Sequence, residues 1–128
     1  MSGVLVDSDV LIEVLRGRNA SVVDNWIRLA NSPEAVLCSP VTVAEIFHGI
    51  REREQSAAEA IFSAIVCLPI SPEIARKAGD YLRAFHKSHA VALGDALIAA
   101  AAQTHQLALW TNNRKHFPMK DVRFFKTG

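Results

Sequence analysis

The chain has 128 residues, 50% of them hydrophobic, and its 14 Lys and Arg residues nearly balance 13 Asp and Glu residues. This length and composition predict a single domain over residues 1–128 and exclude a disordered or strongly charged chain. A net charge of +1 argues against a protein that binds nucleic acid with its whole surface. The charges are separated along the chain, because residues 1–75 carry ten acidic and five basic side chains and residues 76–128 carry three and nine. A local charged site is therefore compatible with the composition.

In the first half of the chain, short apolar runs alternate with segments of helical periodicity. The expected elements are a buried strand at residues 3–6, a helix whose apolar stripe ends at Gly17, a helix at 20–31, a strand at 35–38, and helices at 40–54 and 56–65. Ser39 and Pro40 are the N-cap and first-turn proline of the helix that they open. The stripe of Val22, Val23, Trp26 and Ile27 is expected to pack in the core.

The second half of the chain repeats the alternation. Its expected elements are a strand at residues 66–70, a helix opened by Ser71 and Pro72 that runs to residue 87, an alanine-rich helix at 95–106, a strand at 107–110 and a candidate fifth strand at 122–125. Short apolar strands that alternate with helices predict an α/β fold, a three-layer α/β/α sandwich around a mostly parallel sheet.

Neither a membrane span nor a disulfide is expected. No segment approaches the roughly 20 apolar residues of a transmembrane helix, and the apolar run at residues 4–6 is too short for a signal peptide. Cys38 and Cys67 both lie in apolar runs, so we expect free, buried thiols. These features predict a cytoplasmic protein.

Four oxygen-bearing side chains from distant parts of the sequence are predicted to meet at one edge of the sheet. Asp7 follows the first strand, and Asn113 follows the fourth. Glu45 lies in the second turn of the helix after the second strand, on the side away from its expected apolar face of Val43, Ile46, Phe47 and Ile50. Asp95 begins the helix that leads back into the fourth strand. Because the carboxyl ends of parallel strands share an edge, topology brings all four together.

Three carboxylates held close together repel one another, and a hard divalent cation removes that repulsion. Oxygen ligands suit Mg²⁺ or Mn²⁺, and the natural reaction is metal-assisted hydrolysis of a phosphodiester. The histidines at 48, 86, 89, 105 and 116 show no metal-ligand spacing, and His86 and His89 are expected on the surface. Simpler roles remain open for each site residue alone: a helix cap for Asp7, a first-turn acid for Asp95, a solvated face for Glu45 and a turn for Asn113.

The four segments around these residues are similar to a known family. Residues 4–12, 39–49, 94–100 and 109–117 resemble, in that order, the segments that carry the four acidic positions of PIN domains, specifically of VapC-type toxins from bacterial toxin–antitoxin pairs. The resemblance spans nearly the whole chain. Some relatives have Asp where this chain has Asn113, whose carbonyl can bind a metal but brings no charge. Many relatives have Asn where this chain has Asp9, so either metal ligation or a helix-terminus role is open for Asp9.

The resemblance implies a metal-dependent endoribonuclease that is the toxin of a type II toxin–antitoxin system. Asp7, Glu45 and Asp95 would hold Mg²⁺ or Mn²⁺, and water would cut RNA to leave a 5′-phosphate and a 3′-hydroxyl. The family implies a homodimer and a VapB-type antitoxin whose C-terminal segment enters the acidic groove.

Basic side chains of the second half of the chain suggest where RNA would bind. Arg114 and Lys115 follow Asn113 and are candidates to hold a phosphate, and Thr111 is a candidate to hydrogen-bond a carboxylate or a phosphate. Arg16 and Arg18 follow the first helix, and the sequence does not decide whether either touches RNA or a partner.

Two other functions remain as alternatives. A non-catalytic PIN-like module that binds RNA or protein would use the same fold, although such a module would be expected to have lost several acids. Asp7-Ser8-Asp9 also resembles the Asp-x-Asp of haloacid-dehalogenase-type phosphatases, but the Gly-Thr expected after it is missing.

Overall fold

The computed structural model describes residues 3–128, which form a four-stranded parallel sheet with the strand order β3-β2-β1-β4. The strands are β1 (Gly3–Val6), β2 (Ala35–Cys38), β3 (Val66–Cys67) and β4 (Ala108–Trp110). The helices are α1 (Ser8–Arg16), α2 (Ala20–Ala30), α3 (Pro40–Gly49), α4 (Gln55–Ala64), α5 (Pro72–His89) and α6 (Leu93–Thr104), with 3₁₀ turns η1 (Glu52–Glu54) and η2 (Arg114–His116).

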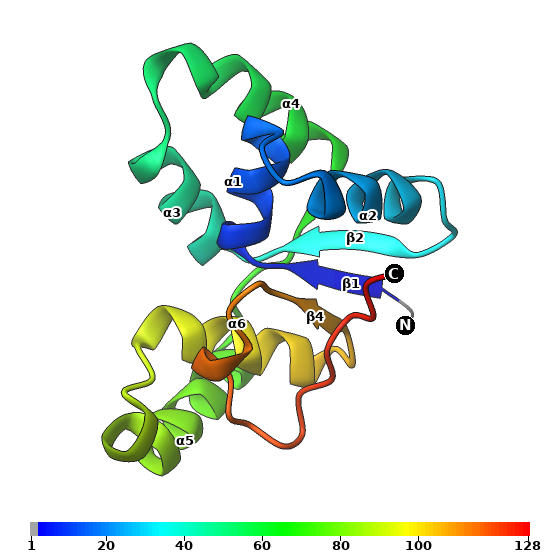
Figure 1. Cartoon of the computed structure of the whole chain (residues 1–128). Helices are drawn as coiled ribbons and strands as arrows, with labels where there is room; N and C mark the ends of the chain where they lie inside the picture. The colour runs from blue at the N-terminus through cyan, green and yellow to red at the C-terminus, as the bar shows by residue number, and fades with distance from the viewer. Residues whose placement is uncertain (1–2) are drawn as a thin grey trace.

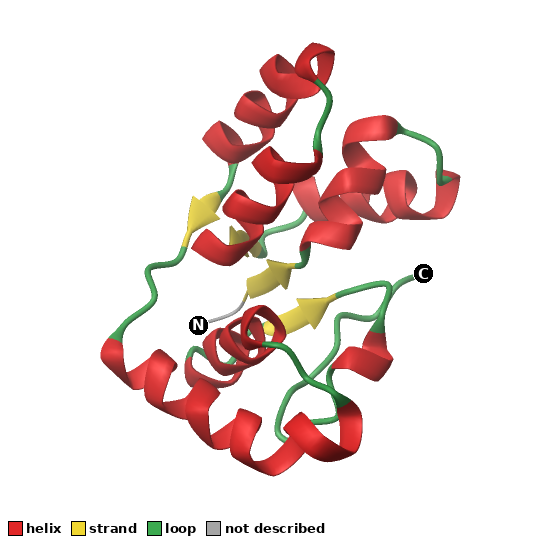
Figure 2. Ribbon diagram, turned by 90° about the vertical axis from the view of Figure 1, so that its left-hand side faces the viewer, coloured by secondary structure: helices red, strands yellow, loops and turns green. Residues whose placement is uncertain are grey.

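The helices form two layers, one on each side of the sheet. Helices α1 to α4 lie on one side and α5 and α6 on the other (Figure 1), and the view turned by 90° shows the strands between the two layers (Figure 2). The predicted three-layer α/β/α sandwich is therefore confirmed. Within residues 3–128, no helix combines the length and the apolar character that a membrane span requires.

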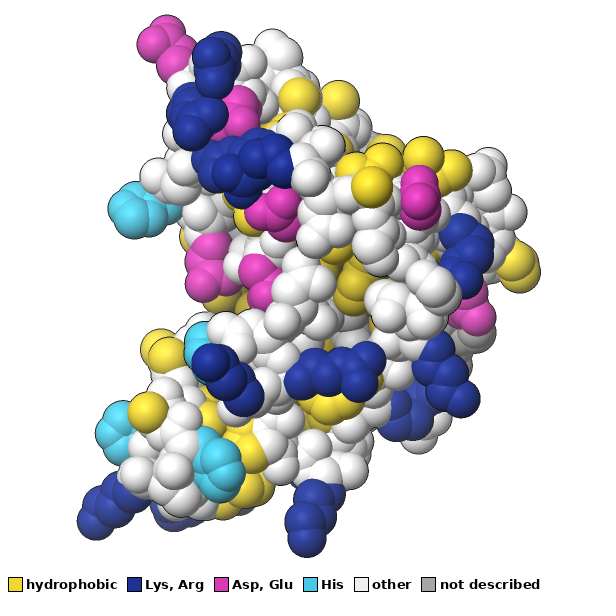
Figure 3. Space-filling view, viewed as in Figure 1, with side chains coloured by type: hydrophobic (Ala, Val, Ile, Leu, Met, Phe, Trp, Pro, Cys, Tyr) yellow, Lys and Arg dark blue, Asp and Glu magenta, His cyan; other side chains and the backbone are white. Residues whose placement is uncertain are grey.

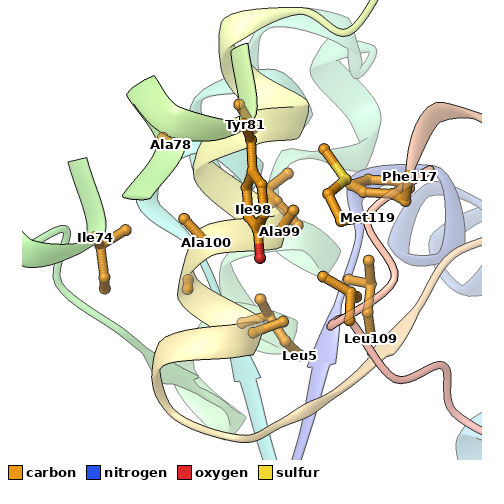
Figure 4. Packing of buried hydrophobic residues seen from close by; sticks show 14 of the residues in the cluster. Leu5, Ile74, Ala78, Tyr81, Ile98, Ala99, Ala100, Leu109, Phe117 and Met119 are labelled. Atoms are coloured by element: carbon orange, nitrogen blue, oxygen red, sulfur yellow. The ribbon is translucent and has the colours of Figure 1, made fainter. Parts of the chain in front are cut away.

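Each face of the sheet has its own hydrophobic core, which explains why the strands are apolar at consecutive positions. Val4 and Val6 of β1 pack with the cluster under α1 and α2, whereas Leu5 between them packs with the cluster under α5 and α6. In the second cluster, Leu5 and Leu109 lie beneath Ile98 and the neighbouring alanines of α6 (Figure 4). Both faces of the central strand are thereby buried.

Helix α6 is alanine-rich because it is covered on several sides. Ala96, Ala99, Ala100, Ala101 and Ala102 are at most 2% exposed. Tyr81 of α5 lies on one side of the helix and Met119 of the C-terminal segment on another (Figure 4). Small side chains allow this close approach, and the helix holds Asp95 in its first turn.

The predicted helix starts are confirmed by their caps. The Ser39 hydroxyl accepts a hydrogen bond from the Val41 N–H at 3.1 Å, and the Ser71 hydroxyl accepts one from the Ile74 N–H at 3.2 Å. Helix α1 is capped at its C-terminal end by Gly17, whose φ of 63° is the left-handed conformation that glycine favours.

Three predicted elements are wrong by three residues or more, and the alanine-rich helix expected over 95–106 spans Leu93–Thr104. The helix expected over residues 40–54 ends at Gly49, because Ile50 and Arg51 are extended and the Glu54 carboxylate accepts the Arg51 N–H at 2.9 Å to start a new turn. The strand expected at 66–70 is limited to Val66–Cys67, since Pro69 has no N–H to donate. Residues 122–125 contribute an isolated bridge, Leu109 to Phe124, and not a fifth strand.

Several burial predictions are also wrong. Cys38 is buried but Cys67 is exposed, because β3 is a short edge strand, and both thiols are free. Helix α2 buries Val22, Asn25 and Leu29 and leaves Ile27 52% exposed. Asn25 turns inward because its side-chain oxygen accepts the Gly128 N–H at 2.9 Å. On α3, Thr42 and Ile46 are buried, whereas Phe47 is exposed and packs against Phe62 of α4.

Candidate functional site

Asp7 lies at the junction of β1 and α1 and is 7% exposed. Its Oδ1 accepts the Ser8 N–H at 2.9 Å as the N-cap of α1, and its Oδ2 accepts the Thr111 hydroxyl at 2.9 Å. Burial, followed by the negative charge of Asp9, raises the pKa of Asp7 to about 7. Asp7 therefore acts as a helix cap and also lies at the carboxyl edge of the sheet.

Thr111 connects the loop after β4 to Asp7, the N-cap of α1, and to Asp9 in its first turn. Its Oγ1 lies 2.9 Å from Asp7 Oδ2 and 3.3 Å from Asp9 Oδ2, so its single hydrogen can serve one carboxylate at a time. The hydroxyl also accepts the Asn113 N–H at 3.1 Å, and Asp9 accepts the Asn112 N–H at 3.1 Å. Burial raises the pKa of Asp9, although these hydrogen bonds oppose the shift.

Glu45 reaches the same edge from α3. Its Oε1 accepts the Ser8 hydroxyl at 3.0 Å, and its charge contributes to the raised pKa of Asp7. Gly94, which precedes Asp95, approaches this carboxylate closely: a Cβ there would lie 3.9 Å from Glu45 Oε2 and 3.3 Å from a methyl of Val41. The start of α6 therefore packs against α3 beside Glu45.

Asp95 and Asn113 meet at His116. The His116 Nδ1 lies 3.8 Å from Asp95 Oδ2, and the Asn113 side-chain nitrogen lies 3.1 Å from the imidazole nitrogens. Burial raises the pKa of Asp95, and the nearby His116 opposes that shift. Sequence reasoning missed His116, although its spacing of three residues from Asn113 places the two side chains together on a 3₁₀ turn.

Charged side chains of both signs surround this edge of the sheet. In the space-filling view, acidic groups border an indentation between the α1–α4 layer and the α5–α6 layer, and histidine and basic groups lie on the other side of it (Figure 3). Arg114 and Lys115 are both exposed. The Arg114 guanidinium lies 4.8 Å from the centre of the Phe124 ring and is directed toward the C-terminal segment.

The donor set is carboxylate oxygen throughout, which fits a hard divalent cation such as Mg²⁺ or Mn²⁺. Two features support that fit: the buried Asp7 with its raised pKa, and the negative charges of Asp9 and Glu45 that act on it. Asp95 follows Gly94, which packs beside Glu45. Among residues 3–128, no three His, Cys, Asp or Glu side chains are already arranged around one point as ligands. A cation would therefore have to draw carboxylates together.

Comparison with known proteins defines the class. Residues 4–123 match the family model of the PIN domain, and the chain belongs to the PIN domain family. Ribonuclease VapC10 from Mycobacterium tuberculosis is 40% identical over 117 residues, which cover 91% of this chain and 86% of the relative.

Two solved structures share the fold. One is VapBC2 from Rickettsia felis bound to a promoter DNA fragment, with a TM-score of 0.80 and 21% identity over 95% of this chain and 96% of that chain. The other is a toxin–antitoxin complex from Klebsiella pneumoniae, with a TM-score of 0.71 and 24% identity over 94% of this chain and 95% of that chain.

Proposed function

We propose that this protein is a metal-dependent endoribonuclease and the toxin of a type II toxin–antitoxin system. One observation carries the proposal: a chain 40% identical to a VapC ribonuclease over nearly its full length brings Asp7, Glu45 and Asp95 to one edge of its sheet. Membership of the PIN family also removes the support for a haloacid-dehalogenase-type phosphatase.

In this proposal, Asp7, Glu45 and Asp95 hold Mg²⁺ or Mn²⁺. When bound, the cation supplies positive charge beside the phosphodiester and activates water for hydrolysis. Thr111 keeps Asp7 oriented through its 2.9 Å hydrogen bond, and Ser8 does the same for Glu45 at 3.0 Å. Asn113 contributes an amide without charge, and its side chain lies beside His116 at the same edge of the sheet.

The partners in this proposal are RNA as the substrate, a VapB-type antitoxin and a second copy of the chain. The antitoxin is supported by the fold shared with toxin–antitoxin complexes. Lys115 is exposed beside the site and is the better candidate for a phosphate contact, because Arg114 is already engaged with Phe124 and the Phe125 carbonyl. An RNA substrate also makes the cytoplasm the expected location.

Cleavage of single-stranded RNA by the purified protein tests the proposal. We expect cleavage with Mg²⁺ or Mn²⁺, none in EDTA, and a loss of at least about 100-fold in kcat for Asp7→Asn or Asp95→Asn. Asp80→Asn is the matched control, because Asp80 is an exposed acid on α5 that pairs with Arg83. Full activity in EDTA, or wild-type activity of Asp95→Asn, contradicts the mechanism.

A folded wild-type protein that binds RNA but does not cut it with any divalent cation would instead support the non-catalytic PIN-like alternative.

The toxin assignment has a separate test in cells. We expect growth arrest when the protein is induced, and relief when the small neighbouring gene is expressed with it.

A further inference from the structure

A cavity of about 230 Å³ adjoins the acidic edge, between α1 and α3. Ser8, Asp9 and Glu45 line it, and so does Arg16. Asp9 and Arg16 are seven residues apart on α1, which corresponds to two helical turns and about 10 Å. The cavity therefore extends from the carboxylates toward a cation.

The walls between these charged groups are apolar or open. Ile12 and Ile46 line the cavity, and Gly49 lies on the α3 side. A Cβ at Gly49 would meet nothing within 4 Å, so the absence of a side chain there leaves space. A volume of this size is smaller than a typical drug-sized site and suits one nucleotide fragment.

Arg16 is held in place by Glu54. Its Nε donates to Glu54 Oε2 at 3.1 Å and one terminal nitrogen donates to Oε1 at 3.4 Å, with the Arg16 side chain 19% exposed. The Arg51 N–H fixes the same carboxylate at 2.9 Å. Because a guanidinium has five N–H donors, this pair orients Arg16 and leaves further donors for a ligand.

Arg18 differs from Arg16 in exposure and in position, a difference that the sequence alone did not reveal. Its side chain is 58% exposed and pairs with Glu13 at 2.7 Å. Among residues 3–128, Arg16 is the basic side chain that lines the cavity, and Arg18 does not line it. The structure thus separates two arginines that are two positions apart.

We propose that this cavity is a substrate subsite, in which Arg16 binds a backbone phosphate of the nucleotide next to the bond being cut. This inference rests on the proposed ribonuclease function. Arg binds phosphate through two parallel N–H donors, and Ile12 and Ile46 contact the sugar or base. The carboxylates at the other end exclude a phosphate from that end unless a divalent cation is bound.

The test compares Arg16→Met with the matched control Arg18→Met on a fluorescent single-stranded RNA in Mg²⁺. We expect Arg16→Met to raise KM about tenfold or more with kcat little changed, because a charged hydrogen bond to the bound substrate is lost. Arg18→Met should stay within about twofold of wild type. Arg16→Lys should recover part of the loss, since the charge remains but the planar fork does not.

Two further variants separate binding from a structural role. Glu54→Gln weakens the ion pair but keeps the guanidinium and one side-chain oxygen to accept from it, so its KM should rise less than that of Arg16→Met. Gly49→Val adds a side chain at the wall of the cavity and leaves the Arg16–Glu54 pair unchanged, and it should raise KM. In the inactive Asp95→Asn background, Arg16→Met should also reduce the slope of log affinity against log salt by about 0.7, as expected for one lost phosphate contact to a single strand.

The outcomes distinguish the two proposals. If wild-type protein does not cleave RNA, the ribonuclease function fails and the subsite fails with it. If wild type cleaves and Arg16→Met keeps its KM and its salt slope, the subsite is overturned while the function stands. Arg16→Met could also bind RNA as well as wild type but no longer be inhibited by the antitoxin. That result would overturn the subsite and assign Arg16 to a protein interface.

Discussion

Asp7 is the residue at which the demands of the site and of stability conflict most directly. It caps α1 and is nearly buried, yet the proposed cation site needs it ionised. Since its folded pKa of about 7 lies above the value of 3.8 in an unfolded chain, the folded state binds its proton more tightly. Below pH 3.8 the Asp7 carboxyl is protonated in both the folded and the unfolded state, so its burial costs no stability. The loss of stability grows as the pH rises above 3.8 and is complete above pH 7.

Asp7→Asn should therefore stabilise the metal-free protein at high pH. Asn keeps a side-chain oxygen for the Ser8 N–H and removes the buried charge. We expect a gain of about 2 kcal/mol in the free energy of unfolding at pH 8 in EDTA, and little change at pH 4. Urea unfolding at both pH values measures it, with Asp80→Asn as the exposed control. An equal effect of Asp7→Asn at the two pH values would show that burial does not hold this carboxyl protonated.

The two cysteines should differ in reactivity although they are partners in the register of β2 and β3. Burial, and then the neighbouring Cys67, raises the pKa of the Cys38 thiol to about 12. Cys67 is exposed at the sheet edge. With iodoacetamide at pH 8, we expect the folded protein to be modified at Cys67 first and at Cys38 only after denaturation, as read by mass spectrometry. Rapid modification of Cys38 in the native state would contradict its burial.

The residues of the site were predictable to different degrees. Asp7 and Asn113 follow strands, so strand recognition alone places them at the edge of the sheet. A hydrogen bond from Thr111 to a carboxylate was expected, and the three-residue spacing of Asn113 and His116 indicates that these two side chains meet. That Thr111 reaches two aspartates and that His116 reaches Asp95 depends on how side chains turn within loops, which the sequence does not encode.

Helix α6 illustrates what an element requires of its residues. Ala99 is fully buried in the cluster that joins α5, α6 and the sheet. Ala99→Leu should destabilise the protein by about 1–3 kcal/mol, because the added methyl groups have no space in a packed core. Ala84→Leu on the exposed face of α5 is the control and should change stability by less than about 0.5 kcal/mol. Thermal or urea unfolding compares them, and equal stabilities would mean that α6 is loosely packed.

At the scale of elements, starts were easier to predict than ends and faces. Ser39-Pro40 and Ser71-Pro72 define their helices because a cap acts locally. The end of α3 depends on Glu54 capping a new turn, and the buried face of α2 depends on Asn25 binding the distant Gly128 backbone. Both features depend on contacts outside the helix concerned, which the pattern of apolar residues within that helix does not indicate.

For the whole molecule, the alternation of strands and helices was sufficient to predict the layers and the parallel sheet. The peripheral parts were harder, because β3 and the segment around Phe124 pair over very few residues. Such short pairings form where the rest of the fold leaves a strand edge unpaired. They involve too few residues to give a recognisable pattern in the sequence.

A divalent cation should stabilise the folded protein as a whole. The carboxylates from α1, α3 and α6 come together only in the folded state, so a bound cation shifts the unfolding equilibrium by mass action. At 100 times its dissociation constant, Mg²⁺ or Mn²⁺ should add about 2.7 kcal/mol to the free energy of unfolding. The melting temperature should rise with added Mn²⁺ for wild type and for Asp80→Asn, and much less for Asp7→Asn. No shift for wild type would argue against a cation site.

The pairing of β1 with β4 joins Val4 to Ala108 and brings Asp7 to Thr111 across almost the whole sequence. Contacts this distant form late, and during synthesis they must wait for the C-terminal part of the chain to leave the ribosome. A growing chain thus carries Asp7 and Glu45 long before it has Asp95 or the loop that orients Asp7. We therefore expect the proposed ribonuclease to stay inactive toward the RNA and the ribosome that are making it until its own translation is nearly finished.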